Sequence, residues 1–500
     1  MSGDGIKLME WKVGLQNPAE KFLTAEPVGH RVNAAGIGLK QRQTWTLEMS
    51  ADDTVYLKSY LGYYLSADKF GNVTCDKKNA TETEKFKLEY AKDGSGRWSF
   101  RHAQFEYFLG GNGETVQCLA RAASDTEMSI WHAPVAMHPQ ITLYNVNRKR
   151  YVVMENGALH CNSDAPWGPN ALITLEFFCG KYRFKTADNH YLSNDGTLLE
   201  SHGKDTQFTL ELKFGRESDL RGIAFKDING KYLTAIGASA LVKTRNKSVS
   251  KDELFRMDEC HPQIVIQSQK GKFASIRNGL EVMVNAIEET NKEIFQVEYD
   301  KKSKKWGIFT VDNRFWNVNE ANTIIADASK LSTECLFDFE WKGDGKAAIK
   351  ASNRKYFTNK PIGNAVTSSD VVSEKEIYVI KLVNRPLIVF KCEYGFVAQK
   401  TSGSNKTEYI CNKSMYDVIL LEQEENGVYH LKGDNEKYWS VTDGHTIKAN
   451  SSKPSPFILE FRGNSLLSIL APNGKYIRAE KSGGFRAVSD VVDKNSLWYF

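Results

Sequence analysis

The chain has 500 residues, of which 41% are hydrophobic and 25% charged, and its 66 basic and 61 acidic residues leave a net charge of +5. This length exceeds one domain, and the mild basic excess permits an acidic partner without requiring one. No apolar segment approaches the roughly 20 residues that span a bilayer, so we expect no membrane insertion. Residues 1–11 mix acidic and basic side chains and do not resemble a secretory signal. The eight cysteines form no Cys-x-x-Cys pair, which indicates reduced thiols in the cytoplasm.

One short pattern recurs along the chain: a turn that often holds a basic residue, an anchor aromatic, and a run of small or aliphatic residues. Copies early in the chain are Lys21–Ala25 and Gly62–Ala67. The anchors, in chain order, are Phe22, Tyr64, Phe108, Tyr151, Tyr191, Tyr232, Phe273, Phe315, Tyr356, Phe396, Tyr438 and Tyr476. Their spacing of about 41 residues defines twelve repeats.

Each repeat is predicted to be all β. A second short run follows the anchor, as in Asn72–Cys75, and a stronger run closes the repeat, as in Phe86–Glu89, Phe337–Glu340 and Phe457–Glu460. Apolar and polar residues alternate in these runs, with the period of a half-buried strand. Short strands separated by turns indicate a barrel or a sandwich.

A longer period groups the repeats in threes. Pro139, Pro262 and Pro386 lie in similar segments about 123 residues apart. Three hairpin repeats in pseudo-threefold order predict a β-trefoil, a six-stranded barrel capped by three hairpins. A propeller is disfavoured because the dipeptides of WD repeats are missing and twelve blades exceed the usual number. We therefore expect an all-β chain of four tandem β-trefoil domains, at residues 8–137, 138–260, 261–383 and 384–500.

Catalytic motifs are missing from the sequence, which shows no nucleophile elbow, P-loop, zinc-protease or dinucleotide-binding pattern. His138 and His261 precede equivalent prolines and are interpreted as structural. The glycine-rich stretch Leu109–Gly113 follows an anchor and is interpreted as a hairpin turn, because no helix follows to bind a phosphate. We expect no enzyme activity, no cofactor and no metal.

Binding functions of other classes have weaker support. Ricin-type lectin trefoils carry a Gln-x-Trp triplet in each repeat, and only Gln43–Trp45 matches it here, so a carbohydrate-binding trefoil array stays an alternative. The tip Lys301–Lys305 is interpreted as a solvated loop. Nucleic-acid binding is not expected, because the aromatics occupy core positions and are not interleaved with exposed charges.

Several separate stretches in the same order make the chain resemble the fascins, a family that bundles actin filaments in filopodia and microvillus-like protrusions. They include Lys21–Glu26, Gln43–Glu48, Ala67–Cys75, Ala136–Gln140, Pro166–Gly168, Lys251–Phe255, Asn384–Pro386 and Ser496–Trp498. The resemblance covers essentially the whole length and agrees with four β-trefoils. It implies a monomeric cytoplasmic cross-linker of filamentous actin that packs filaments into tight parallel bundles. A one-site protein that decorates actin filaments without linking them is the alternative within this class.

The resemblance also implies two basic surfaces. The first comprises Lys21, Lys40, Arg42, Lys355, Glu393, Lys400 and Lys475, and the second comprises Arg97, Arg148, Lys149 and Arg150. Two departures affect them. Gly38 stands where many members have a phosphorylatable serine, so we expect that switch to be absent or relocated. Glu106 stands where some members have a basic residue near Arg97.

Overall fold

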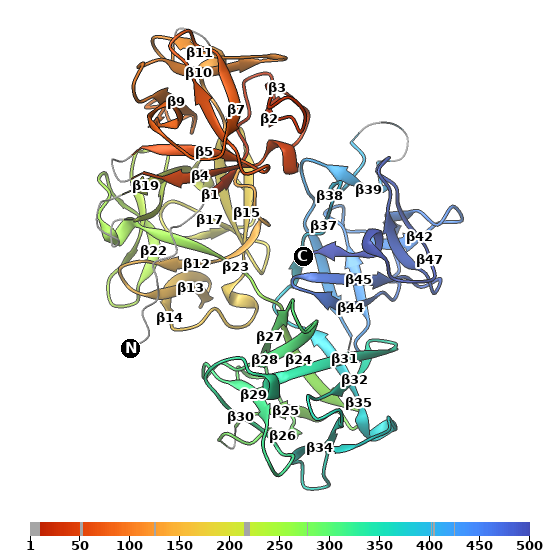
Figure 1. Cartoon of the computed structure of the whole chain (residues 1–500). Coiled ribbons are helices and arrows are strands. Elements are labelled where there is room, and N and C mark those ends of the chain that lie inside the picture. The colour runs from red at the N-terminus through yellow and green to blue at the C-terminus, as the bar shows by residue number, and fades with distance from the viewer. Residues whose placement is uncertain are drawn as a thin grey trace. The chain divides into compact units, whose positions relative to one another are not determined.

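The fold was analysed in a computed structural model, which describes residues 11–50, 54–124, 127–214, 221–277, 279–401, 403, 406–424 and 426–500. These residues form short strands and three-residue 3-10 turns, with no α-helix among them (Figure 1). The chain divides into two compact units. Unit 1 holds residues 1–164 and 173–258, and unit 2 holds residues 165–172 and 259–500. The expected start of the first domain, residue 8, lies outside the described residues.

Unit 1 contains the strands of trefoils 1 and 2. Trefoil 1 has β1 (Trp11–Val13), β2 (Phe22–Ala25), β3 (Val32–Gly36), β4 (Trp45–Met49), β5 (Val55–Ser59), β6 (Tyr64–Ala67), β7 (Val73–Lys77), β8 (Phe86–Tyr90), β9 (Trp98–His102), β10 (Phe108–Asn112) and β11 (Thr115–Ala120). Trefoil 2 has β12 (Gln140–Asn145), β13 (Arg150–Glu155), β14 (Ala158–Ser163), β15 (Ile173–Phe178), β16 (Lys181–Thr186), β17 (Tyr191–Leu192), β18 (Leu198–Leu199), β19 (Thr209–Phe214), β20 (Arg221–Lys226), β21 (Tyr232–Ile236), β22 (Leu241–Asn246) and β23 (Phe255–Glu259).

Unit 2 contains trefoils 3 and 4. Trefoil 3 has β24 (Gln263–Ser268), β25 (Phe273–Ser275), β26 (Met283–Ala286), β27 (Phe295–Asp300), β28 (Lys305–Phe309), β29 (Phe315–Val318), β30 (Ile324–Ala328), β31 (Leu336–Gly343), β32 (Lys346–Lys350), β33 (Tyr356–Asn359), β34 (Ala365–Ser369) and β35 (Ile377–Leu382). Trefoil 4 has β36 (Leu387–Ile388), β37 (Lys391–Cys392), β38 (Gly395–Gln399), β39 (Tyr409–Lys413), β40 (Ile419–Gln423), β41 (Tyr429–Lys432), β42 (Tyr438–Val441), β43 (Ile447–Ser451), β44 (Ile458–Gly463), β45 (Leu466–Leu470), β46 (Tyr476–Ala479), β47 (Phe485–Ser489) and β48 (Trp498–Tyr499).

Trefoil 3 shows the closed barrel most completely. Its strands pair in the ring β24–β27–β28–β31–β32–β35, and β35 returns to β24 through the register Ile264↔Leu382. The hairpins β25–β26, β29–β30 and β33–β34 lie off this ring and contact one another through isolated bridges, such as Met283↔Asn364. Six barrel strands with three capping hairpins are the β-trefoil that the repeat pattern predicts. The prediction of an all-β fold with four such domains is confirmed.

The anchor aromatics mark where the hairpins begin. Ten of them are the first residue of their strand, and Tyr151 and Phe396 are the second. The residue that follows each anchor is fully buried, as at Leu23, Trp316 and Trp439. The anchors themselves are less buried, so the expectation that they fill the core is only partly correct. The innermost position belongs to the next residue, whose burial contributes about 1.5–3 kcal/mol for a large apolar side chain.

The hydroxyl groups of tyrosine anchors form hydrogen bonds with carboxylates at the wall of the barrel. The Tyr64 hydroxyl donates to Glu48 at 2.6 Å, and Lys58 pairs with the same carboxylate at 2.8 Å while lying 5.0 Å from the Tyr64 ring centroid. Tyr356 with Glu340 repeats this contact in trefoil 3. An anchor tyrosine therefore keeps its ring packed and its hydroxyl satisfied.

Each unit joins its two trefoils through close glycine contacts. In unit 1, a Cβ on Gly96 of trefoil 1 would lie 2.0 Å from the carbonyl oxygen of Gly180 in trefoil 2. In unit 2, a Cβ on Gly345 would lie 2.6 Å from the carbonyl oxygen of Gly427. The expected domains are joined by linkers of only a few residues, which predicts that neighbouring domains pack on one another, and within each unit the two trefoils do so. Close backbone contacts at glycines therefore join the two trefoils in both units.

Candidate functional site

The first expected surface is divided between the two units. Lys21, Lys40 and Arg42 belong to unit 1, whereas Lys355, Glu393, Lys400 and Lys475 belong to unit 2. Each set is described by itself below.

In unit 1, two of the three cations have no carboxylate partner within the described residues. Lys21 precedes β2, and its backbone N–H donates to Asn17 Oδ1 at 2.9 Å. Lys40 is exposed and precedes the 3-10 turn η1 (Gln41–Gln43). Arg42 lies in that turn and forms an ion pair with Glu26 at 3.1 Å, with its side chain 54% exposed. The ammonium groups of Lys21 and Lys40 are therefore available to an acidic partner.

In unit 2, the three lysines each hold an internal carboxylate. Lys355 lies 3.3 Å from Asp370, and Lys475 pairs with Asp490. Both partners lie fifteen residues after their lysine, because the two lysines occupy equivalent places in their repeats.

The remaining two residues of this set flank β38. Lys400 follows this strand and pairs with Glu408 at 2.6 Å. Glu393 is exposed in the turn between β37 and β38. An acidic partner would have to displace the internal carboxylates of the lysines, which weakens their contribution.

The residues of the second expected surface differ in whether their cationic groups already bind another group of the chain. Arg97 lies in the β8–β9 turn and binds Asp93 at 2.6 Å. The Arg148 guanidinium donates to the carbonyl oxygens of Ala235 and Gly237, both at 3.0 Å. These two bonds give Arg148 a structural role in joining the β12–β13 turn to the β21–β22 hairpin.

Lys149 ends the β12–β13 turn and Arg150 begins β13. Lys149 is exposed, and Arg150 pairs with Asp164 at 3.1 Å. Within the described part of unit 1, no hydrogen bond or ion pair joins Arg97 to Arg148, Lys149 or Arg150. Lys149 is the most available cation of this set.

The two departures from the family pattern have clear structural settings. Gly38 is buried between Ile37 and Leu39. Glu106 binds Lys87 at 3.0 Å and also pairs with Arg101, so it neutralises cations near the Arg97 hairpin.

The lone lectin-like triplet, Gln43–Trp45, has a structural role. Trp45 is fully buried and donates its Nε1–H to the Leu23 carbonyl oxygen at 2.9 Å.

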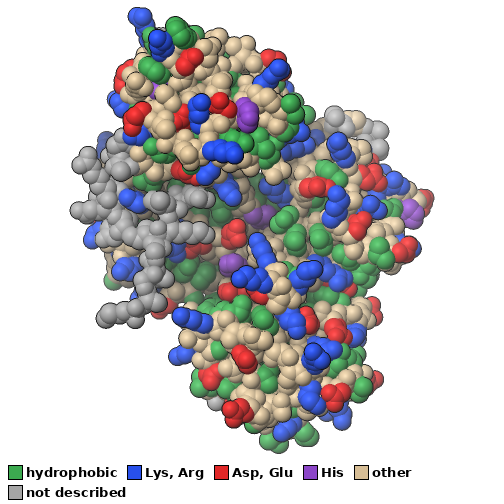
Figure 2. All heavy atoms as spheres, in the orientation of Figure 1, with side chains coloured by type: hydrophobic (Ala, Val, Ile, Leu, Met, Phe, Trp, Pro, Cys, Tyr) green, Lys and Arg blue, Asp and Glu red, His purple; other side chains and the backbone are tan. Residues whose placement is uncertain are grey.

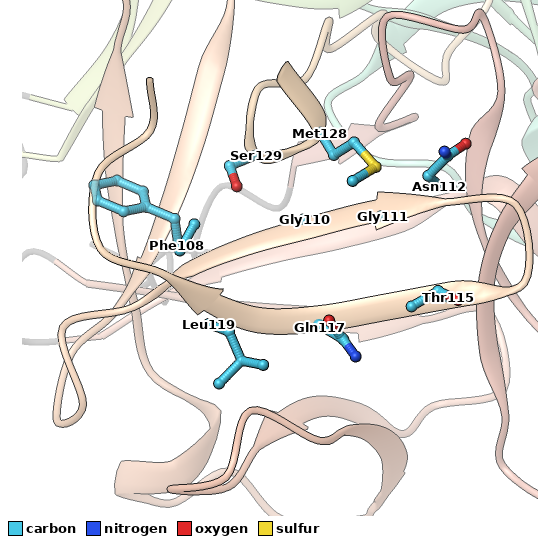
Figure 3. Close-up of a pocket in the computed structure, with 10 residues that line it drawn as sticks. Phe108, Gly110, Gly111, Asn112, Thr115, Gln117, Leu119, Met128 and Ser129 are labelled. Atoms are coloured by element: carbon cyan, nitrogen blue, oxygen red, sulfur yellow. The ribbon is translucent and has the colours of Figure 1, made fainter. Parts of the chain in front are cut away.

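A hollow of about 460 Å³ lies along the β10–β11 hairpin of trefoil 1 (Figure 3). It is lined by Phe108, Gly110, Gly111, Asn112, Thr115, Gln117, Leu119, Ala120, Met128 and Ser129, none of which is charged. A Cβ on Gly111 would lie 2.9 Å from Ala34 Cβ, and one on Gly110 would lie 3.1 Å from Ser129 Oγ. The glycines allow this close packing. The prediction of a hairpin turn is only partly correct, because Leu109–Asn112 lie in strand β10 and only Gly113 belongs to the turn.

The counter-ions were not predicted from the sequence, because each cation was considered only together with the residues of its own loop. Figure 2 shows basic and acidic side chains intermixed on the face that it presents. The fifteen-residue spacing shared by Lys355–Asp370 and Lys475–Asp490 was a signal that could have revealed two of the pairs. No cluster of three metal-ligating side chains occurs among the described residues, and no helix in that part of the chain is long and apolar enough to span a membrane.

Comparison with known proteins identifies the family. The Fascin domain model matches residues 19–132, 141–257, 269–380 and 395–500. The chain is 34% identical to Fascin-2 of Mus musculus over 500 residues, covering 99% of both chains. It is 31% identical to Fascin of Strongylocentrotus purpuratus over 511 residues, covering 98% of this chain and 99% of that one. A solved structure with some likeness, the designed ThreeFoil, has a TM-score of 0.22 and 12% identity over 24% of this chain and 96% of its own, too low to bear on the fold. The chain belongs to the fascin family of actin-bundling proteins.

Proposed function

We propose that this chain cross-links actin filaments into tight parallel bundles as a monomer without enzyme activity, in the cytoplasm of actin-rich protrusions such as filopodia or microvilli. Family membership over the whole length carries the proposal. Filamentous actin is acidic, so exposed cations supply steering and salt-sensitive affinity. Bundling also needs two surfaces on one body, because one surface would only decorate a filament.

The first proposed surface uses Lys21, Lys40 and Arg42 together with the set on unit 2, and the second uses Arg97, Lys149 and their neighbours. Lys21, Lys40 and Lys149 support this assignment best, since no carboxylate among the described residues pairs with them. Arg148 has the weakest support as a contact residue because its guanidinium already holds two carbonyl groups. We further propose domain limits at 8–137, 138–260, 261–383 and 384–500.

Sedimentation with purified actin filaments across a salt series tests the proposal. A bundler pellets filaments at low centrifugal speed, and this pelleting falls steeply as salt rises. Binding that is detected only at high speed would contradict cross-linking and indicate a one-site side-binder. Pelleting at neither speed would contradict actin binding and reopen the carbohydrate-binding alternative, which glycan retention would then test.

A further inference from the structure

Two cysteines of trefoil 4 lie in contact next to the exposed turn that carries Glu393. Cys392 ends β37, and its thiol donates to the backbone oxygen of Cys411 in β39 at 3.2 Å. The Cys411 thiol itself donates to the backbone oxygen of Gly484 at 3.1 Å. Cys392 is 6% exposed and Cys411 is fully buried. Because both side chains are buried, a reagent that reaches the pair has to be a small molecule.

A glycine of β38 lies between the two strands that hold the cysteines. Cys392 pairs with Gly395 across the β37–β38 hairpin. A Cβ on Gly395 would lie 2.5 Å from the carbonyl oxygen of Lys413, so the β38 and β39 backbones are close at this point. Since Gly395 has no side chain, the Cys392 thiol reaches across it to β39.

The chemical environment separates Cys392 from other buried cysteines of the chain. The neighbouring Cys411 side chain lowers the pKa of Cys392, whereas Cys392 raises the pKa of Cys411. Burial instead raises the pKa of Cys75 to about 11 and that of Cys118 to about 12. A thiolate is the form that reacts with peroxides, so Cys392 is the more reactive member of the pair.

We propose that Cys392 and Cys411 are a peroxide-sensitive dithiol whose disulfide weakens filament binding by the surface that includes Glu393 and Lys400. The Cys392 thiolate attacks one peroxide oxygen, the O–O bond breaks, and the sulfenic acid of Cys392 and hydroxide are formed; the hydroxide takes up the proton that the thiol released and leaves as water. The Cys411 sulfur then attacks the Cys392 sulfur and displaces hydroxide, which leaves as water with the Cys411 proton. The two sulfur atoms lose two electrons to the peroxide, and a thiol reductant restores both thiols.

The position of the pair connects this chemistry to the proposed surface. Forming the bond brings the sulfur atoms to about 2.05 Å, which draws the end of β37 towards β39. Glu393 follows Cys392 directly, and Tyr394 holds the far side of the turn through a 3.3 Å bond to Asn495. The displacement is therefore concentrated in the turn. This effect on binding rests on the proposed function, whereas disulfide formation does not.

Mass spectrometry of the full chain after hydrogen peroxide treatment tests the disulfide. Trypsin should yield residues 392–400 linked to residues 407–413, and dithiothreitol should separate them. Cys411→Ala should abolish the linked peptide. The matched control is Cys335→Ala, because Cys335 is also fully buried but its thiol, among the residues that the structure describes, bonds only to Ser332 and the Lys330 carbonyl oxygen. Oxidation of the exposed Cys179 shows that the peroxide has acted on the protein. Oxidised Cys179 without the linked peptide would overturn the proposal.

Sedimentation of the oxidised and reduced protein with actin filaments tests the regulation. We expect oxidation to weaken bundling several-fold, reversibly, and this change should be lost in Cys411→Ala but kept in Cys335→Ala. A linked peptide with unchanged bundling would overturn the regulatory role. If the reduced protein does not bundle filaments at all, the proposed function fails, while the linked peptide still decides whether the dithiol reacts.

Discussion

Single residues of the candidate surfaces differ in the partners that they already hold. Lys21 and Lys40 have no carboxylate partner among the described residues, whereas Lys355, Lys400 and Lys475 each have one. An exposed ion pair contributes only about 0–1 kcal/mol, so a filament can break it, but the cost reduces the affinity gained. The counter-ions are therefore expected to tune binding.

Neutralising a counter-ion should strengthen binding. Asp490→Asn releases Lys475, so we expect filament affinity to rise about two- to fivefold at low salt, in line with the small energy of an exposed pair. High-speed co-sedimentation measures the affinity. The matched control is Asp344→Asn, which makes the same charge change in unit 2 at an exposed aspartate that holds no lysine within the described residues. An equal gain in both variants would show that only net charge matters.

A half-buried carboxyl group near Lys400 should make stability depend on pH. Burial raises the pKa of Asp417 to about 6, although its carboxylate accepts the Gln399 N–H at 2.7 Å. Asp434 raises this pKa further and Lys413 lowers it. The unfolded chain has a carboxyl pKa near 4. Between these values the native state binds more protons, so the free energy of unfolding falls as pH rises from about 4 to above 6.

Asp417→Asn should remove this contribution. The variant should gain about 2–3 kcal/mol relative to the parent chain on going from pH 4 to pH 7, which follows from a shift of about two pKa units. Urea unfolding at several pH values measures the difference. A constant difference between the two proteins across this range would contradict the raised pKa of Asp417.

The strands and turns show which structural elements can be predicted from sequence patterns. The anchors predict the starts of the hairpins because a turn followed by an aromatic is a local signal, and strand alternation predicts closing strands such as β8 and β31. The 3-10 turns before the closing strands were not predicted, although Ser250 and Glu253 form a capping box around Lys251–Glu253 that is visible in the sequence. The glycine contacts between trefoils could not be predicted, because Gly96 and Gly180 are brought together only by folding.

The contact between Gly96 and Gly180 should be essential to the pairing of trefoils 1 and 2. Gly180 has φ +80°, and a Cβ there would lie 2.5 Å from the Ser95 carbonyl oxygen. The matched control is Gly157, which has φ +73° and nothing within 4 Å of its Cβ position. We expect Gly157→Ala to lose about 1–2 kcal/mol from backbone strain and Gly180→Ala to lose about 1–3 kcal/mol more. Urea unfolding decides this, and equal losses would contradict a structural role for the contact.

At the scale of the whole molecule, repeat spacing predicts four trefoils because each domain buries its own barrel core. The candidate surfaces were harder to predict, since availability depends on counter-ions that the fold supplies from other strands. Asp164 on Arg150 and the two carbonyl groups on Arg148 are examples. Resemblance to the family identifies these positions, but only the structure separates an engaged guanidinium from an available ammonium group.

The central claim is that one chain holds two separable filament-binding surfaces. The most direct test is paired low-speed and high-speed sedimentation of the Lys21→Glu, Lys40→Glu double variant, with Lys77→Glu, Lys78→Glu as a charge-matched control in the same trefoil. The double variant should still co-sediment with filaments at high speed through the second surface but should fail to bundle them at low speed. The control should retain bundling. If the double variant bundles like the parent chain, or loses all filament binding, the claim of two separable surfaces is wrong.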